Sequence, residues 1–274
     1  MATTVGPIFF TLFVWWFSTG AVLYAVGLPR RNLPNLILAS TAAAGFALYG
    51  LYASSTGTSV SAAFISFTCA LVIWAWHEMT FLTGLITGPR ITPLPGREGA
   101  ISNKPAPLGP SIETVIYHEV AIVLTIALAA ALTREGVNQT GFWTLVILWV
   151  MRLSAKFNLY LGVPNLTEQF LPEHLAYLKG YFCRRSMNLL FPVSVTASTI
   201  VTILLFSAAA DSAATAFETA SLTLLATLMA LAVIEHWFMV VPLPSAELWS
   251  WGLSSREPVA ARDGVCPPAR RADH

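Results

Sequence analysis

The sequence predicts an all-α fold, a polytopic membrane helix bundle with about seven transmembrane helices. Of the 274 residues, 55% are hydrophobic and only 11% are charged, whereas a typical soluble domain has roughly 25% charged residues. The mean hydropathy is +0.66. Apolar stretches of about 20 residues, the length that crosses a bilayer, recur along the chain. Most side chains are therefore expected to face lipid or other apolar helices.

Seven stretches are long and apolar enough to span a membrane. They are residues 6–28, 35–53, 60–86, 112–132, 140–160, 188–209 and 217–241. The first has no basic residue before its apolar run, so it is predicted to be a span rather than a cleavable signal peptide. We expect residues 1–253 to form a single transmembrane helical domain. Residues 254–274, rich in Pro and Arg, are expected to be a disordered cytoplasmic tail.

Basic residues mark one side of the membrane. Lys and Arg occur in the connections after the first, third and fifth spans and in the tail, whereas the opposite side has only Arg134. Loops that carry Lys and Arg stay in the cytoplasm. The N-terminus is therefore predicted outside and the C-terminus in the cytoplasm. The alternation holds across every span, which supports the count of seven.

The cytoplasmic segment between spans five and six, residues 161–187, is predicted to contain an amphipathic helix over about 168–182. Apolar residues recur there at spacings of three to four, as expected for one helix face. These residues are Phe170, Leu171, Leu175, Leu178 and Phe182. Such a helix can lie at the membrane interface or fold under the bundle.

Four of the five histidines are adjacent to a glutamate. The pairs are His77-Glu78, His118-Glu119, Glu173-His174 and Glu235-His236. Three pairs lie inside apolar spans, at depths of roughly 8–14 Å from the cytoplasmic boundary at 1.5 Å per residue. An ionisable group in the hydrocarbon region costs about 2.5–3.5 kcal/mol, so these side chains are predicted to face one another.

Other polar residues are expected to support this layer. Arg152, Lys156 and Asn158 of span five fall at the same depth, and Glu168 lies with the fourth pair on the cytoplasmic segment. The carboxylates would pair with Arg152 and Lys156 or with a bound cation. The cytoplasmic segment would close over the layer.

Three interpretations of the layer remain open. Imidazole and carboxylate are the usual ligands of iron, zinc and manganese, so all eight His and Glu residues are candidate ligands of a metal or a tetrapyrrole. The same residues could form a structural hydrogen-bond network or a proton or ion path. Adjacent residues project about 100° apart on a helix, so one member of each pair could bind directly while the other orients a neighbouring ligand.

Several classes of function are excluded or lack support. The net charge of +1 provides no field that would attract nucleic acid. Cys69, Cys183 and Cys266 are far apart and predict neither a disulfide framework nor a thiolate metal site. No HExxH, Walker A, GxSxG or GxGxxG motif is present, so nothing indicates a zincin, a nucleotide site or a serine nucleophile.

Four segments resemble one known family. They are HEMTFLTGLITGPR (77–90), YHEVAIVLT (117–125), LSAKFNLYLGVPNLTEQFLPEHL (153–175) and RRSMNLLFPVSV (184–195). The chain resembles the PuhE family of phototrophic bacteria, photosynthetic complex assembly protein 2, over most of residues 70–240. The resemblance implies a place in the bacterial inner (intracytoplasmic) membrane and in the gene neighbourhood of the reaction-centre H subunit. It implies a role in photosynthetic complex assembly and bacteriochlorophyll levels, with no agreed catalytic residues.

Three functions follow as hypotheses. The first is an assembly factor that holds bacteriochlorophyll or a reaction-centre or light-harvesting subunit, with membrane lipids as its surroundings. The second is a membrane metalloenzyme with iron, zinc or manganese that acts on a tetrapyrrole or isoprenoid. It lacks the ExxH spacing of di-iron bundles. The third, an ion or proton carrier, would need polar groups in the outer half of the membrane, where few occur.

Overall fold

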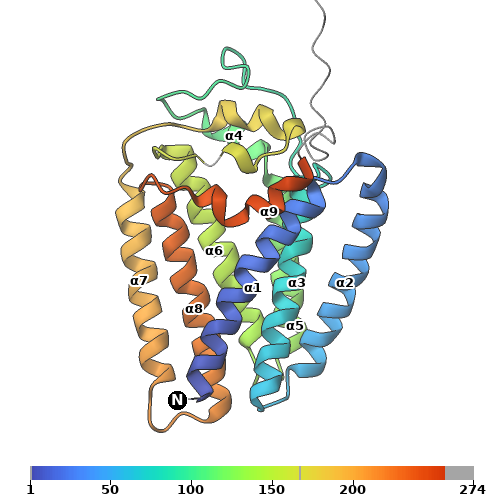
Figure 1. Ribbon diagram of the computed structural model, residues 1–274, viewed down its shortest axis with the longest axis vertical. Helices are drawn as coiled ribbons and strands as arrows, with labels where there is room; N and C mark the ends of the chain where they lie inside the picture. The colour runs from blue at the N-terminus through green and yellow to red at the C-terminus, as the bar shows by residue number, and fades with distance from the viewer. Residues whose placement is uncertain (1, 167, 257–274) are drawn as a thin grey trace, which may run out of the picture.

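The computed structural model describes residues 2–166 and 168–256, and its long helices stand side by side (Figure 1). These helices are α1 (Ala2–Val26), α2 (Leu33–Ser54), α3 (Val60–Leu82), α5 (Ile116–Thr133), α6 (Thr140–Leu161), α7 (Leu190–Ala209) and α8 (Ala216–Phe238). Within the described residues these seven are long and apolar enough to cross a membrane, and no β-strand is assigned there. The predicted all-α membrane bundle is confirmed.

The longer connections gather at one end of the bundle, which we call the capped end. They are residues 83–115, which include α4 (Leu108–Glu113), residues 162–189, and residues 239–256, which include α9 (Ser250–Leu253). The N-terminus and short turns lie at the opposite end (Figure 1). Arg134 lies at that opposite end, whereas the loops of the capped end carry the other basic residues that the structure describes outside the spans.

The helices begin where the sequence supplies partners for free backbone N–H groups. The Ser59 hydroxyl accepts from the Ala62 N–H at the start of α3, and Thr215 forms a capping box with Glu218 at the start of α8. At α7 the side chain of Asn188 accepts from the N–H groups of the first two helical residues. These contacts fix the registers that place the polar residues described below.

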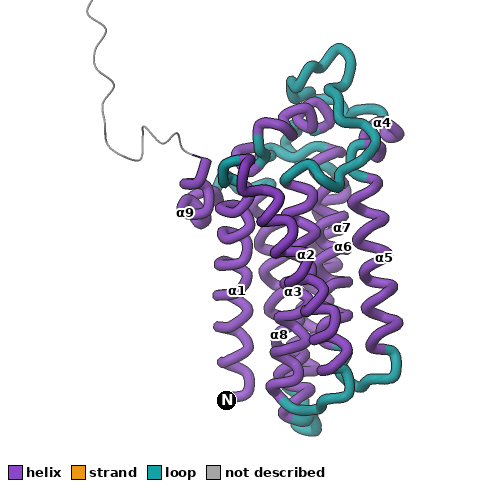
Figure 2. The backbone as a smooth tube through the Cα atoms, turned by 90° about the vertical axis from the view of Figure 1, so that its right-hand side faces the viewer, coloured by secondary structure: helices purple, strands orange, loops and turns teal. Residues whose placement is uncertain are grey.

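Helices α3 and α8 form the centre of the bundle. Their apolar windows are 44% and 56% buried, against 17% for α2 and α7. The core joins α3, α6 and α8 through residues such as Phe67, Met151 and Leu224. Figure 2 places α1 and α5 on opposite sides of these central helices. A residue that points from α3 toward α1 therefore points away from α5.

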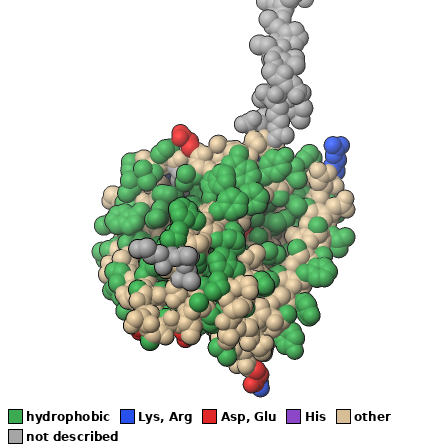
Figure 3. All heavy atoms as spheres, turned by 60° about the horizontal axis from the view of Figure 1, so that its bottom comes forward, with side chains coloured by type: hydrophobic (Ala, Val, Ile, Leu, Met, Phe, Trp, Pro, Cys, Tyr) green, Lys and Arg blue, Asp and Glu red, His purple; other side chains and the backbone are tan. Residues whose placement is uncertain are grey.

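The outer surface matches a lipid-facing protein. Large apolar side chains such as Phe46, Leu189 and Leu204 are exposed, where a soluble protein would carry polar groups. Figure 3, with the opposite end turned forward, shows hydrophobic side chains over most of the visible face and few charged ones. The structure thus supports a multi-pass membrane protein.

The predicted amphipathic helix over 168–182 is not an α-helix. Two 3₁₀ segments, Glu168–Phe170 and Glu173–Tyr181, occupy this range. Pro172 separates them, because proline lacks an N–H and disfavours helical geometry in the residue before it. The predicted apolar face is nevertheless used: Leu175 and Leu178 are buried in a cluster that includes residues of α1 and α3.

Residues 239–256 fold back across the capped end, past the predicted domain boundary at 253. They form the 3₁₀ segment Ser245–Trp249, α9 and the 3₁₀ turn Ser254–Arg256. Two glycines permit the contact with α1, since a Cβ on Gly252 would lie 2.5 Å from the Gly20 carbonyl oxygen and one on Gly20 would overlap Trp251. The remainder of the predicted disordered tail, 257–274, lies outside the described residues.

Candidate functional site

The polar layer lies at the capped end of the bundle, nearer the helix ends than predicted. His77 lies five residues before the end of α3, His118 two residues after the start of α5, and His236 two before the end of α8. These offsets correspond to about 3–8 Å along the helix axes. The difference arises because α3 and α8 end earlier than their predicted spans, and α5 starts later, after the separate helix α4.

His77 and His118 face each other across α3 and α5. Their ring centroids are 6.1 Å apart, and both residues are 1% exposed. The Nε2 of His77 shares a hydrogen bond of 3.1 Å with the Thr125 hydroxyl. Neither Nδ1 atom has a hydrogen-bond partner among the described residues. Each of these two buried imidazoles thus has an Nδ1 without a hydrogen-bond partner, which is unusual for buried polar groups.

Glu119 turns away from the histidine beside it and pairs with Lys156 of α6. The Lys156 amine lies 2.5 Å from Glu119 Oε1, and the Trp149 indole N–H donates to Glu119 Oε2 at 3.1 Å. The Lys156 and Glu119 side chains are 22% and 15% exposed. This ion pair is largely sealed, and the same amine lies 5.4 Å from the centroid of the Phe81 ring.

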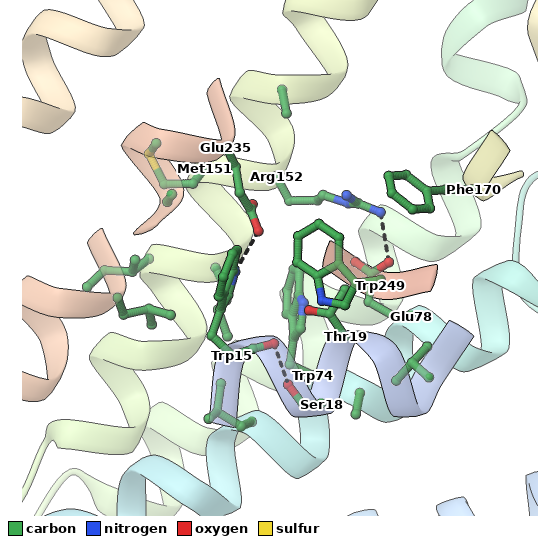
Figure 4. A pocket seen from close by; sticks show the side chains of 18 of the residues that line it. Trp15, Ser18, Thr19, Trp74, Glu78, Met151, Arg152, Phe170, Glu235 and Trp249 are labelled. Atoms are coloured by element: carbon green, nitrogen blue, oxygen red, sulfur yellow. Dashed lines mark hydrogen bonds and ion pairs between the residues drawn. The ribbon is translucent and has the colours of Figure 1, made fainter. Parts of the chain in front are cut away.

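Glu78 and Glu235 point to the other side of α3 and α8, into a cavity that faces α1 (Figure 4). The Arg152 guanidinium donates to Glu78 at 2.8 Å, and the Trp15 indole N–H donates to Glu235 at 2.7 Å. The Arg152 side chain is 44% exposed and lines the cavity. One cation and two carboxylates therefore share one accessible polar end.

His236 has both ring nitrogens engaged. Its Nδ1 donates to the Ala232 carbonyl at 2.9 Å, and its Nε2 shares a hydrogen bond of 2.9 Å with the Ser154 hydroxyl. Asn158, which is 0% exposed, continues this network by donating to the Ser154 carbonyl and accepting from the Asn188 amide at 3.1 Å. Since Asn188 also caps α7, the network joins α6, α7 and α8.

Replacing Asn158 with Leu is expected to lower the stability of the bundle by about 1–3 kcal/mol, because buried partners would lose their hydrogen bonds. A thermal melt of purified protein measures the effect. The matched control is Asn35→Leu, at an exposed position of α2, which should leave the melting temperature nearly unchanged. Equal melting temperatures for the two variants would show that the network does not stabilise the fold.

The fourth pair lies in the cap and does not join the other three. His174 Nε2 donates to the Leu82 carbonyl at the end of α3, at 2.9 Å, and Glu173 is exposed. Glu168 forms ion pairs with Arg184 at 2.5 Å and with Lys179 at 3.9 Å. These residues therefore fasten the segment 168–185 to itself and to α3.

Acidification is expected to loosen this cap. Partial desolvation lowers the pKa of His174 and outweighs the hydrogen bond to the Leu82 carbonyl, which acts to raise it; the charges of Arg30 and Arg256 add to the lowering. His174 therefore takes up a proton more readily in the unfolded segment than in the folded cap. The folded cap is stable above the ordinary histidine pKa of about 6.5 and loses stability as the pH falls below it. Cleavage by trypsin after Lys179 should become several-fold faster between about pH 7.5 and pH 5.5. His174→Gln should remove this difference, and an undiminished pH dependence in that variant would assign the effect to another group.

The residues present do not fit a metal held by three protein ligands. Among the described residues, no group of three or more His, Cys, Asp or Glu side chains is placed to hold a metal ion, whereas catalytic and structural zinc sites use at least three. Neighbours on a helix project about 100° apart, so His77 turns toward His118 while Glu78 turns into the cavity. Metal binding stays a prediction, and the unpartnered Nδ1 atoms of His77 and His118 are where such a site could begin.

The cavity itself was not foreseen from the sequence. It has a volume of about 290 Å³ and is lined by residues of α1, α3, α6 and α8, with Phe170 and Trp249 at its capped end. The partners of Glu235, Glu119 and His236 were also not predicted from the sequence; they are Trp15, Trp149 and Ser154. A search for indole or hydroxyl groups at the depth of the charged residues would have found Trp149 and Ser154, but Trp15 and Trp249 come from distant parts of the chain.

Comparisons with known proteins place the chain in a family without an established activity. A family model described as "Protein of unknown function (DUF3623)" matches residues 1–260. The chain is similar to a Rhodobacter capsulatus protein described as "Uncharacterized 30.4 kDa protein in puhA 5'region". The two are 39% identical over 266 residues, which cover 95% of this chain and 94% of the relative. No solved structure matches this fold. The match along nearly the whole length shows that the chain belongs to the family described as protein of unknown function DUF3623.

Proposed function

We propose that the chain is an inner-membrane assembly factor for bacterial photosynthetic complexes, and that it influences the supply or insertion of bacteriochlorophyll. In this proposal the bundle holds a lipid-soluble molecule while reaction-centre or light-harvesting subunits assemble. The observation that carries the proposal is the cavity between α1 and α6, mostly apolar and with a polar end formed by Glu78, Arg152 and Glu235. Small-molecule sites commonly have this character, with few polar groups in an apolar wall.

The process rests on the relatives rather than on the geometry. The described location of the Rhodobacter capsulatus relative is the 5' region of puhA, and the resemblance to the PuhE family implies the same neighbourhood. The cavity supports a binding role, because its wall is mostly apolar. His77 and His118 remain candidates for axial contact with the magnesium of a bacteriochlorophyll, although their rings lie outside the residues that line the cavity.

The proposal is tested in a phototrophic host that lacks the gene. Near-infrared absorbance of membranes reports reaction-centre and antenna complexes, while immunoblots report the amounts of their apoproteins. Loss of assembled complexes with apoproteins still synthesised, restored by the wild-type gene, is the expected result. Normal complexes in the deletion strain would overturn the proposed function.

The alternative, a membrane metalloenzyme acting on a tetrapyrrole or isoprenoid, would need ligands at the free Nδ1 atoms of His77 and His118. Metal analysis of protein purified from phototrophic membranes separates the two functions. Stoichiometric iron, zinc or manganese that is lost in His77→Ala and His118→Ala would favour the enzyme. Co-purified pigment or lipid without such a metal would favour the assembly factor.

We propose further that the capped end faces the cytoplasm and the N-terminus the periplasm. The capped end carries the basic loops of the described chain, and such loops remain on the cytoplasmic side. Reporter fusions after Glu135 should read periplasmic, and fusions after Phe182 should read cytoplasmic. The reverse pattern, or one side for both fusions, would contradict this orientation.

A further inference from the structure

The shape of the cavity limits what it can hold. Its lining extends from Thr11 to Leu23 of α1, twelve residues or about 18 Å along the helix. This is an elongated slot parallel to the helices, and an extended hydrocarbon chain can lie along it.

The two ends of the slot differ in chemistry. The end toward the middle of the bundle is lined mainly by apolar side chains, Phe67, Leu71, Ile147 and Leu228. Thr11 also lies there, and its buried hydroxyl has no hydrogen-bond partner among the described residues. The capped end presents Glu78, Arg152 and Glu235, with indole rings of Trp15, Trp74 and Trp249 beside them (Figure 4). An occupant that matches both ends is an amphiphile with its head at the capped end and its tail in the core.

The charges at the polar end select the head group. Two carboxylates and one guanidinium give a formal charge of −1 there, which disfavours a phosphate or carboxylate head close to Glu78 and Glu235. A hydroxyl group can accept from the Arg152 guanidinium and donate to either carboxylate. It satisfies these groups without adding charge.

Two aromatic side chains lie above this head-group position, next to the partly exposed Arg152. Phe170 and Trp249 both line the capped end, and their rings pack edge to face with centroids 5.9 Å apart. Trp249 is held in place by donating its indole N–H to the Trp16 carbonyl at 3.0 Å. The segment 245–256 therefore acts as a cover over the head group.

We infer that the slot binds a single long-chain alcohol, straight or isoprenoid, with its hydroxyl between Arg152 and the carboxylates and its chain between α1 and α6. This inference adds a ligand class to the proposed function. It rests on that function, because the proposed function is the reason for treating the cavity as a binding site. It names the ligand class as a single-chain neutral amphiphile.

Quenching of tryptophan fluorescence tests this inference directly. Stearyl alcohol with bromine at carbons 2 and 3, next to its hydroxyl, is titrated into the full-length protein in lipid nanodiscs, because bromine quenches indoles within contact distance. Three of the nine tryptophans line the slot beside the head-group position. The expected result is saturable quenching by the alcohol, at concentrations at least about tenfold below those needed for dibromostearic acid. That ratio corresponds to about 1.4 kcal/mol of discrimination.

Two substitutions of the same kind provide the control. Ala75→Phe fills the slot from α3, whereas Ala43→Phe adds the same ring at an exposed position of α2. Ala75→Phe should weaken alcohol binding at least about tenfold and Ala43→Phe should not. Ala232→Phe, which fills the slot from α8, provides a second variant if Ala75→Phe does not fold.

Three results would overturn the inference: quenching that rises without saturation, equal quenching in the slot-filling and control variants, or tighter binding of the acid. These binding results are independent of whether the deletion strain assembles photosynthetic complexes. The inference can therefore fail while the assembly function stands. Conversely, alcohol binding together with normal complexes in the deletion strain would preserve the slot and overturn the assembly function.

Discussion

Replacing Lys156 with Met is expected to destabilise the bundle by about 3–5 kcal/mol, because the Glu119 carboxylate would lose its cationic partner in a nearly sealed site. The Lys156 amine lies 2.5 Å from Glu119, and the two side chains are only 22% and 15% exposed. The Trp149 N–H would remain as a donor to Glu119, but one neutral donor does not compensate a buried charge. Melting temperature and membrane yield measure the loss.

The double variant Glu119→Gln with Lys156→Met separates the two possible causes. Removing both charges is expected to recover most of the lost stability, because the cost lies in the stranded charge rather than in the missing contact. Lys104→Met, in the exposed part of the cap, is the matched control for removing a lysine. A double variant as unstable as Lys156→Met alone would show that packing by the lysine stem, and not the ion pair, is what stabilises this site.

The spans could be predicted because each depends on composition over a whole helix. All seven structural helices begin and end within a few residues of the predicted stretches, and the short turns separate them where polar residues interrupt the apolar pattern. The predicted helix over 168–182 was wrong in type, since the apolar spacing on which it depended took no account of the break at Pro172. Its buried positions, Leu175 and Leu178, were correct because they depend on spacing alone.

Which polar residues lie at the same depth could be predicted from the sequence. The direction in which each of them points could not. Depth along a helix follows from counting residues, and this placed His77, His118 and Arg152 together. Rotation about the helix axis depends on tertiary packing. That rotation directs His77 toward α5 while its neighbour Glu78 turns toward α6 and the cavity. Contacts from Trp15 and Trp249 depend on segments more than 200 residues apart, and no local pattern reveals these contacts.

The ion pair between Arg152 and Glu78 is expected to behave differently from the sealed pair, because it faces the cavity. The Arg152 side chain is 44% exposed, twice the 22% of Lys156. Solvent that reaches the cavity can screen Glu78 and Glu235 after the guanidinium is lost. Glu78 itself is only 14% exposed, so Arg152→Met should cost about 1–3 kcal/mol of stability, less than Lys156→Met, and leave a folded protein in the membrane.

The same substitution is expected to have a large effect on function. If the polar end of the cavity holds the head of a ligand, removing the guanidinium removes a charged hydrogen bond worth about 1.5–3 kcal/mol, or roughly a ten- to hundredfold loss of affinity. In the complemented deletion strain, near-infrared absorbance of the assembled complexes should fall by a comparable factor at low expression of the variant. Arg134→Met, which breaks the exposed pair with Glu135 at the opposite end, should leave the complexes unchanged.

Arg152→Met and Arg134→Met distinguish a binding role of Arg152 from a structural one. The quantity to compare is the amount of assembled photosynthetic complexes per molecule of the variant protein. Complexes that decline while the Arg152→Met protein persists would place the defect in the cavity, because its partners Glu78 and Glu235 remain in a folded bundle. A parallel decline of protein and complexes would instead mean that Arg152 stabilises the fold as Lys156 does. Unchanged complexes with Arg152→Met would show that the polar end of the cavity takes no part in assembly, since Arg152 is the cation that lies between the two cavity carboxylates.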